Sequence, residues 1–214
     1  MKLQRTPLIL LLIALLLGSV VLIYEIQAKP QQEAAEVKKD QLFGFKEEEV
    51  QTLDLTTQTQ KLAFVKTPAG RLTSNQKQDP KQAGKSAEKQ PDSSGWMMTA
   101  PTKVLAEDGA VAYLLNLIAT GQRQQTLTIP AAKLAEFGLD KPLAIADVKL
   151  SNQKTHRLVL GKPNFDRSAI YAQVDPPANS TGDVSVILVS IDFENATTRP
   201  LSEWQKKEKI KDKG

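Results

Sequence analysis

His156 is the only histidine of this sequence and the side chain best suited to move a proton near neutral pH. A histidine-based metal site needs two or three further nitrogen, sulfur or carboxylate ligands at a workable spacing. The neighbours Thr155 and Arg157 place His156 on a predicted strand instead. We therefore interpret it as an ordinary, half-exposed strand residue without a catalytic role.

Three pairs of carboxylates have the chemistry for acid–base catalysis of the glycosidase type. They are Glu107 with Asp108, Asp140 with Asp147, and Asp192 with Glu194. The first pair opens a predicted helix, where free amides and the helix dipole favour negative charge. Asp140 follows a helix end, where a carboxylate can bond local amides, and the third pair opens a predicted helical turn. Nothing in the spacing requires any pair to meet in a cleft.

Other catalytic patterns are missing from the sequence. Gly161 precedes Lys162 without the spacing of a phosphate loop, and no serine lies in a Gly-x-Ser-x-Gly turn. The absence of cysteine excludes disulfides, thiolate metal sites and cysteine nucleophiles. We explain the following side chains as packing residues: Trp96, Met97, Met98 and Tyr113. The sequence thus predicts no catalytic, cofactor-binding or metal-ligating residue, and no enzyme.

Composition predicts one folded domain with an ordinary core. The chain has 214 residues, of which 41% are hydrophobic and 24% charged, with a formal net charge of +4. Lysines cluster in a polar stretch at 71–95 and in the tail at 205–214. No aromatic residues are interleaved with them for base stacking, so we expect no nucleic-acid partner and interpret the tail as disordered and solvated.

The N-terminus carries the strongest signal. Leu8 to Tyr24 is uncharged and dominated by leucine, isoleucine and valine, which predicts a transmembrane helix at 8–26. A cleaved signal peptide is the alternative, but Ile26 two positions before Ala28 makes a poor cleavage site. Lys2 and Arg5 predict that residues 1–7 are cytoplasmic and that the rest of the chain is periplasmic or lumenal.

A polar stalk at 27–41, either helical or flexible, is expected to lead to one domain at 42–204. We expect strands at 50–57 and 61–67, with Leu62, Phe64 and also Val65 as candidates for inward side chains. The stretch 71–95 has almost no large apolar residues, which predicts a disordered insertion. The sheet then resumes at 96–100.

The second half of the domain is predicted to hold two helices and a β-meander. A longer helix starts at 107–108 and ends at Gly121, and a shorter one runs from Pro130 to Gly138 with Leu134 and Phe137 facing the core. Strands are expected at 125–129, 144–150, 157–160, 169–174 and 184–190, and a helical turn at 192–196. Leu201 and Trp204 are expected to pack back onto the domain. This grouping predicts an α+β fold of mostly antiparallel sheet.

The order of these landmarks resembles the bacterial family known as domain of unknown function 4340. The matching residues are Val50 to Leu55, Trp96 followed by Pro101, the Ala-Glu-Asp of 106–108, the Phe-Gly-Leu-Asp-Lys-Pro of 137–142, the Leu-Val-Leu-Gly of 158–161, and the Ile-Tyr-Ala of 170–172. The resemblance covers about 42–204, and the insertion at 71–95 departs from it. It implies one membrane helix and an accessory role beside ABC-type export or gliding-motility components.

Three functions remain open from the sequence. The first is a membrane-tethered, non-catalytic module that binds a protein partner, such as a component of an ABC-type transport or envelope complex. The second is an extracytoplasmic domain that binds a small molecule, lipid or glycan, which would need an apolar pocket between sheet and helix. The third is an enzyme, which would need its scattered carboxylates to converge in one concave site.

Overall fold

The computed structural model describes residues 40–67, 95–178 and 180–207. The chain divides into two compact units, Met1–Gln41 and Leu42–Gly214. Of the first unit, only the last two residues are described. The second unit is called the domain below. The predicted cytoplasmic segment, transmembrane helix and most of the stalk lie outside the described residues, as do nearly all of the insertion and the end of the tail. Within the described ranges, no helix has both the length and the apolar character needed to span a membrane.

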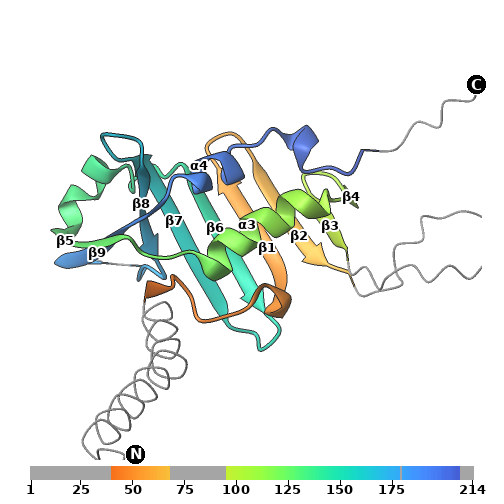
Figure 1. Cartoon of the computed structure of the whole chain (residues 1–214), viewed down its shortest axis with the longest axis horizontal. Coiled ribbons are helices and arrows are strands. Elements are labelled where there is room, and N and C mark those ends of the chain that lie inside the picture. Colours follow the sequence, from red (N-terminus) through yellow and green to blue (C-terminus); the bar gives the residue numbers. More distant parts are fainter. Residues whose placement is uncertain (1–39, 68–94, 179, 208–214) are drawn as a thin grey trace, which may run out of the picture. The chain divides into compact units, whose positions relative to one another are not determined.

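A single nine-stranded sheet forms the frame of the domain (Figure 1), and every strand pairing in it is antiparallel. Its spatial order is β4-β3-β2-β1-β6-β7-β8-β9-β5. The strands are β1 (Val50–Thr57), β2 (Lys61–Lys66), β3 (Trp96–Ala100), β4 (Val104–Leu105), β5 (Gln125–Pro130), β6 (Ala144–Leu150), β7 (Thr155–Pro163), β8 (Ala169–Val174) and β9 (Asp183–Ser190). The predicted antiparallel sheet with a few helices is confirmed.

Helix α3 (Asp108–Thr120) lies across one face of this sheet (Figure 1). Its apolar positions recur at helical spacing, and Val111, Leu114, Leu115 and Ile118 are at most 1% exposed. The short helix α4 (Asp192–Thr197) and the 3₁₀ turn η4 (Leu201–Glu203) extend this layer. Trp204 is fully buried with its ring 5.3 Å from that of Phe64, so its predicted packing is confirmed.

The opposite face of the sheet is covered over part of its width. Residues Ala131–Phe137, predicted as a short helix, form a 3₁₀ helix, η3. Leu134 and Phe137 of η3 pack against a second, smaller core that includes Val159 and Val186. The neighbours Leu158 and Leu160 belong to the main core. Because successive side chains of a strand point to opposite faces, η3 and α3 must lie on opposite sides of the sheet.

Several local predictions need correction. Strand β7 is longer than the predicted 157–160, and the short strand β4 was not predicted. In β1, a register shift between Val50 and Thr52 lets both Val50 and Leu53 face the main core, which strict alternation of side chains would not allow. Val65, a candidate for an inward side chain, points outward and is 39% exposed.

Candidate functional site

The part of the sheet that faces away from α3 and lies beyond η3 carries the candidate site. We call this surface the open half-face, and it spans β3, β2, β1, β6 and the start of β7. All of its side chains are partly or fully exposed. They are Thr52, Asp54, Thr56, Lys61, Ala63, Val65, Met97, Thr99, Asp147, Lys149 and Arg157.

A row of charged side chains crosses the middle of the open half-face. Strand register places Asp54 opposite Asp147, and Asp147 opposite Arg157. The Arg157 guanidinium donates two hydrogen bonds to the Asp147 carboxylate, from Nε to Oδ1 at 2.6 Å and from Nη2 to Oδ2 at 3.0 Å. Such a two-pronged pair fixes the geometry of both side chains.

The electrostatics of this row follow from its pairing. The hydrogen bond to Asp147, helped by its negative charge, raises the pKa of Arg157. Partial burial, and secondarily the charge of Asp147, raises the pKa of Asp54. Among the described residues, the carboxylate of Asp54 makes no hydrogen bond or ion pair, whereas that of Asp147 is neutralised by Arg157. Asp54 is therefore the carboxylate of the row that can accept a cation from outside.

His156 precedes Arg157 along β7, so its side chain points to the other face of the sheet and serves a different contact. Its Nδ1 lies 2.8 Å from Oδ2 of Asp175, whose other oxygen accepts the backbone N–H of Arg157 at 2.7 Å. The imidazole ring also stacks on Phe45 at 5.4 Å between centroids, and lies 5.1 Å from Phe43. The predicted position on a strand is confirmed, and the side chain ties β7 to the start of the domain. None of these three partners was foreseen from the sequence.

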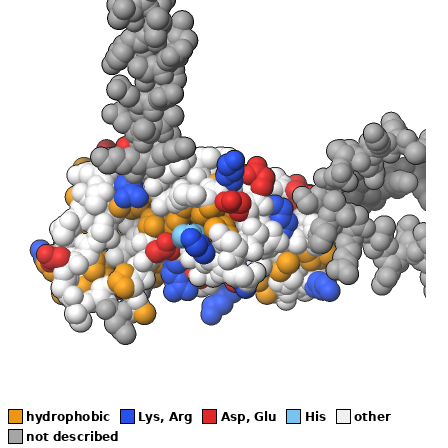
Figure 2. All heavy atoms as spheres, turned by 90° about the horizontal axis from the view of Figure 1, so that it is seen from below, with side chains coloured by type: hydrophobic (Ala, Val, Ile, Leu, Met, Phe, Trp, Pro, Cys, Tyr) orange, Lys and Arg blue, Asp and Glu red, His pale blue; other side chains and the backbone are white. Residues whose placement is uncertain are grey.

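An open depression of about 430 Å³ lies at this end of β7. It is lined by Asp147, Thr155, His156, Arg157, Asp175 and Pro176. Figure 2, a view of the end where β6 and β7 are joined, shows the histidine at the surface between hydrophobic, acidic and basic side chains. The imidazole, the guanidinium and both carboxylates are each bonded to a neighbour.

The remaining carboxylates weighed in the sequence lie apart from this row. Glu107 makes no capping bond with its side chain, contrary to expectation, and Asp108 instead accepts the backbone N–H of Trp96 at 2.8 Å. Asp192 accepts a hydrogen bond from the Ser190 hydroxyl at 2.8 Å. Glu194 pairs with Arg167. Asp108, Asp192 and Glu194 thus each have a structural partner of their own.

Two glycines of the family-like motifs have structural roles. Gly138 ends η3 with a φ of +69°, a conformation that other residues adopt only with strain. A Cβ on Gly161 would lie 2.2 Å from the carbonyl oxygen of Phe137. These glycines allow η3 to end directly against β7. The motifs that contain them therefore specify packing of η3 on the sheet rather than phosphate binding.

Sequence reasoning missed the charged row because strand register decides it. Asp147 had been compared with Asp140, which is an exposed loop residue, whereas its neighbours are Asp54 and Arg157 on adjacent strands. Tyr113, expected in the core, is 39% exposed and lies under the Arg199 guanidinium. Over the described residues there is no group of three or more His, Cys, Asp or Glu side chains suited to a metal ion.

Comparison with models of known protein families gives one match. The model of a domain of unknown function (DUF4340) matches residues 96–211, more than half of the chain. The matched region starts at β3, so it leaves out the first two strands, which the resemblance in sequence had included. No curated protein and no solved structure matches the chain. By its match over 96–211, the chain belongs to the DUF4340 family.

Proposed function

We propose that this chain is a membrane-tethered, non-catalytic module that binds a protein partner through the open half-face on the extracytoplasmic side. The observation that carries the proposal is the unequal covering of the sheet. One face is covered by α3 and α4, and the part of the other face beyond η3 exposes a fixed row of charges. The tether rests on the apolar segment Leu8 to Tyr24 and its basic flank.

The chemistry of the open half-face suits a protein surface. Val65 and Met97 are cross-strand neighbours and supply partly exposed apolar area beside the charged row. Asp54 offers a carboxylate with room for an external cation, while the Asp147–Arg157 pair offers polar edges already held in place. We expect the partner to present a lysine or arginine opposite Asp54, within a contact patch of mixed polarity.

The binding of a small apolar ligand between sheet and helix is less well supported. The side chains between α3 and the sheet, including Leu53, Leu55 and Leu114, are fully buried and fill that space. The depressions near β7 and near the β8–β9 connection are open and lined largely by polar residues. We keep the partner class that the family resemblance implied, an ABC-type transport or envelope complex, as part of the proposal.

The proposal is tested by comparing two matched substitutions. The partner is first captured by crosslinking the full-length chain in the membranes of cells that produce it, and is then purified. Val65→Glu on the open half-face should weaken its binding by about tenfold or more, because a charge is added within the contact. Asn116→Glu, on the exposed side of α3, should leave binding unchanged. Capture of no partner, or equal effects of both changes, would overturn the proposal.

A further inference from the structure

Phe165 is the most exposed large apolar side chain among the described residues, at 105% of its reference area. It lies in the β7–β8 loop, between Pro163 and Ala169. An exposed aromatic side chain contributes no burial free energy to folding, because its surface meets water in both the folded and the unfolded chain. Scattered apolar residues on a surface are common, so exposure alone assigns no role. The rigid loop that carries Phe165 gives a further reason to assign it one.

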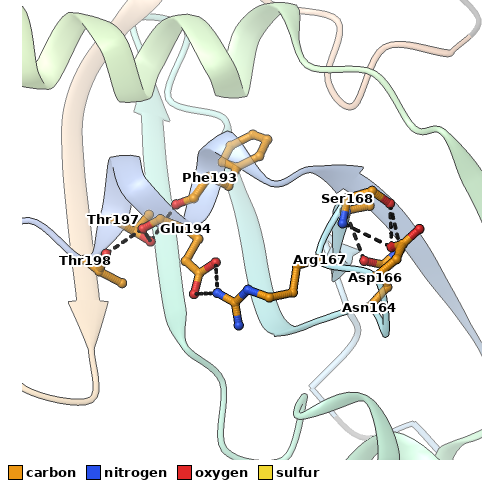
Figure 3. Close-up of polar contacts among 9 residues, drawn as sticks. Asn164, Asp166, Arg167, Ser168, Phe193, Glu194, Thr197 and Thr198 are labelled. Atoms are coloured by element: carbon orange, nitrogen blue, oxygen red, sulfur yellow. Dashed lines mark hydrogen bonds and ion pairs between the residues drawn. The ribbon is translucent and has the colours of Figure 1, made fainter.

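This loop is held by hydrogen bonds among its own residues (Figure 3). Asn164 and Ala169 are joined twice, by Asn164 N–H to the Ala169 carbonyl at 2.9 Å and by Ala169 N–H to Asn164 Oδ1 at 3.1 Å. Asp166 Oδ1 accepts hydrogen bonds from both the backbone N–H and the hydroxyl of Ser168. Thus the residues on either side of Phe165 are fixed within the loop itself.

A longer contact ties the same loop to α4. Arg167 has a φ of +57° in the left-handed region, and its Nη2 lies 2.9 Å from both carboxylate oxygens of Glu194. Figure 3 shows the Arg167 side chain reaching from the loop to Glu194. A strained backbone persists only where its surroundings hold it. The loop therefore presents Phe165 from a preorganised position, which lowers the entropic cost of using it in a contact.

We propose that Phe165 is an apolar anchor that docks into a hydrophobic pocket, rimmed by basic side chains, on a protein partner of this domain. The proposal rests on the proposed function, since it assigns a second contact with that partner. Buried aromatic anchors dominate the energetics of many protein interfaces. A short loop with one fully projecting ring fits a pocket, whereas a flat contact would leave much of the ring in water.

The charge of Asp166 favours a protein pocket over an anionic lipid surface. Asp166 follows Phe165 directly, and hydrogen bonds from Ser168 lower the pKa of its carboxyl. Insertion of the ring into a bilayer would bring this ionised carboxylate to the headgroups, which is unfavourable at an anionic membrane. The chain also enters the domain beside His156, near the start of β7, and β7 is 9 residues or roughly 30 Å long. Phe165 thus lies at the end of the domain far from the point of chain entry.

The test uses site-specific crosslinking of the full-length chain in cells that produce it. The photoreactive residue p-benzoylphenylalanine replaces Phe165 in one variant and Lys154, an exposed residue at the other end of β7, in the control. The expected result is one discrete adduct with the same protein that the wild-type chain captures, formed from position 165 and not from 154. Adducts with lipid, adducts with a second copy of this chain, or identical adducts from both positions would each overturn the proposal.

A binding measurement separates this inference from the proposed function. Phe165→Ala should weaken binding of the purified partner by about tenfold, while Phe165→Leu should retain most of it, because the pocket requires an apolar group. Unchanged binding by Phe165→Ala would overturn the anchor, yet the proposed function would stand if Val65→Glu still weakened binding as expected. Vesicles of phosphatidylethanolamine and phosphatidylglycerol should not shift the emission of a Phe165→Trp variant, and a blue shift would show a lipid contact instead.

Discussion

The same strands supply alternate side chains to the two faces of the sheet, but the two faces are covered to different extents. On the face that carries α3, the inward side chains of β1, β2, β6 and β7 are almost completely buried in one continuous core. On the other face, η3 covers a small cluster over β5, β7, β8, β9 and the start of β6, and the rest of this face exposes polar and apolar side chains together. The difference indicates that stability resides mainly on the α3 face, which leaves the open half-face available for recognition.

The largest expected effect separates the two cores. Leu114 of α3 is fully buried, so Leu114→Ala should reduce the free energy of unfolding by about 2–5 kcal/mol. Leu134 of η3 is only partly buried, and Leu134→Ala should cost about 1 kcal/mol. Chemical denaturation followed by tryptophan fluorescence measures both. Equal losses would contradict the assignment of stability to the α3 face.

The next effect concerns how η3 is attached. Gly161→Ala places a methyl group against the Phe137 carbonyl and should cost about 1–3 kcal/mol. The expected local result is faster hydrogen exchange in η3 with little change in α3. Gly44→Ala is the control, since a Cβ there meets no atom within 4 Å, and it should change stability by less than about 0.5 kcal/mol. Protection lost in both helices together would show that the two faces are not separate.

A smaller effect is expected in the charged row. The Arg157 and Asp147 side chains are 55% and 36% exposed, so their pairing should contribute only about 0.5 kcal/mol to stability. A double-mutant cycle with Arg157→Ala and Asp147→Ala measures the coupling, which should shrink at high salt. A coupling of several kcal/mol would place this pair among the stabilising elements and argue against a recognition role.

The smallest effect depends on pH. Because the pKa of Asp54 is raised on folding, the stability linked to it is present below the unfolded value and is lost as pH rises through the folded value. Asp54→Asn removes this loss, so the variant should match or exceed the wild type by a few tenths of a kcal/mol at pH 7, with no difference below about pH 4. Thermal unfolding across pH 3–7 checks this, with Asp140→Asn as the exposed control. A variant less stable than the wild type at pH 7 would contradict the assignment.

The sequence predicted the elements of the fold better than their relations. Period-two and period-3.6 patterns located the long strands and α3, because burial of one face forces these patterns on the sequence. The pairing of Asp54 with Asp147 could not be predicted, since strand register follows from the whole sheet and a shift of one residue reverses every side chain. The exposure of Phe165 was also hidden, because a single aromatic between polar neighbours, here Asn164 and Asp166, indicates neither burial nor exposure.

The role of the open half-face is best decided by a scan of photoreactive residues over both faces in cells that produce the full-length chain. Each variant carries one photoreactive residue. In the first set it replaces Lys61, Thr99 or Lys149 on the open half-face, and in the matched set it replaces Ala112 or Asn116 on the outer side of α3. We predict adducts with a single protein from the open half-face and none from α3. Adducts from α3 alone, or none from either face, would contradict the assignment of recognition to the open half-face.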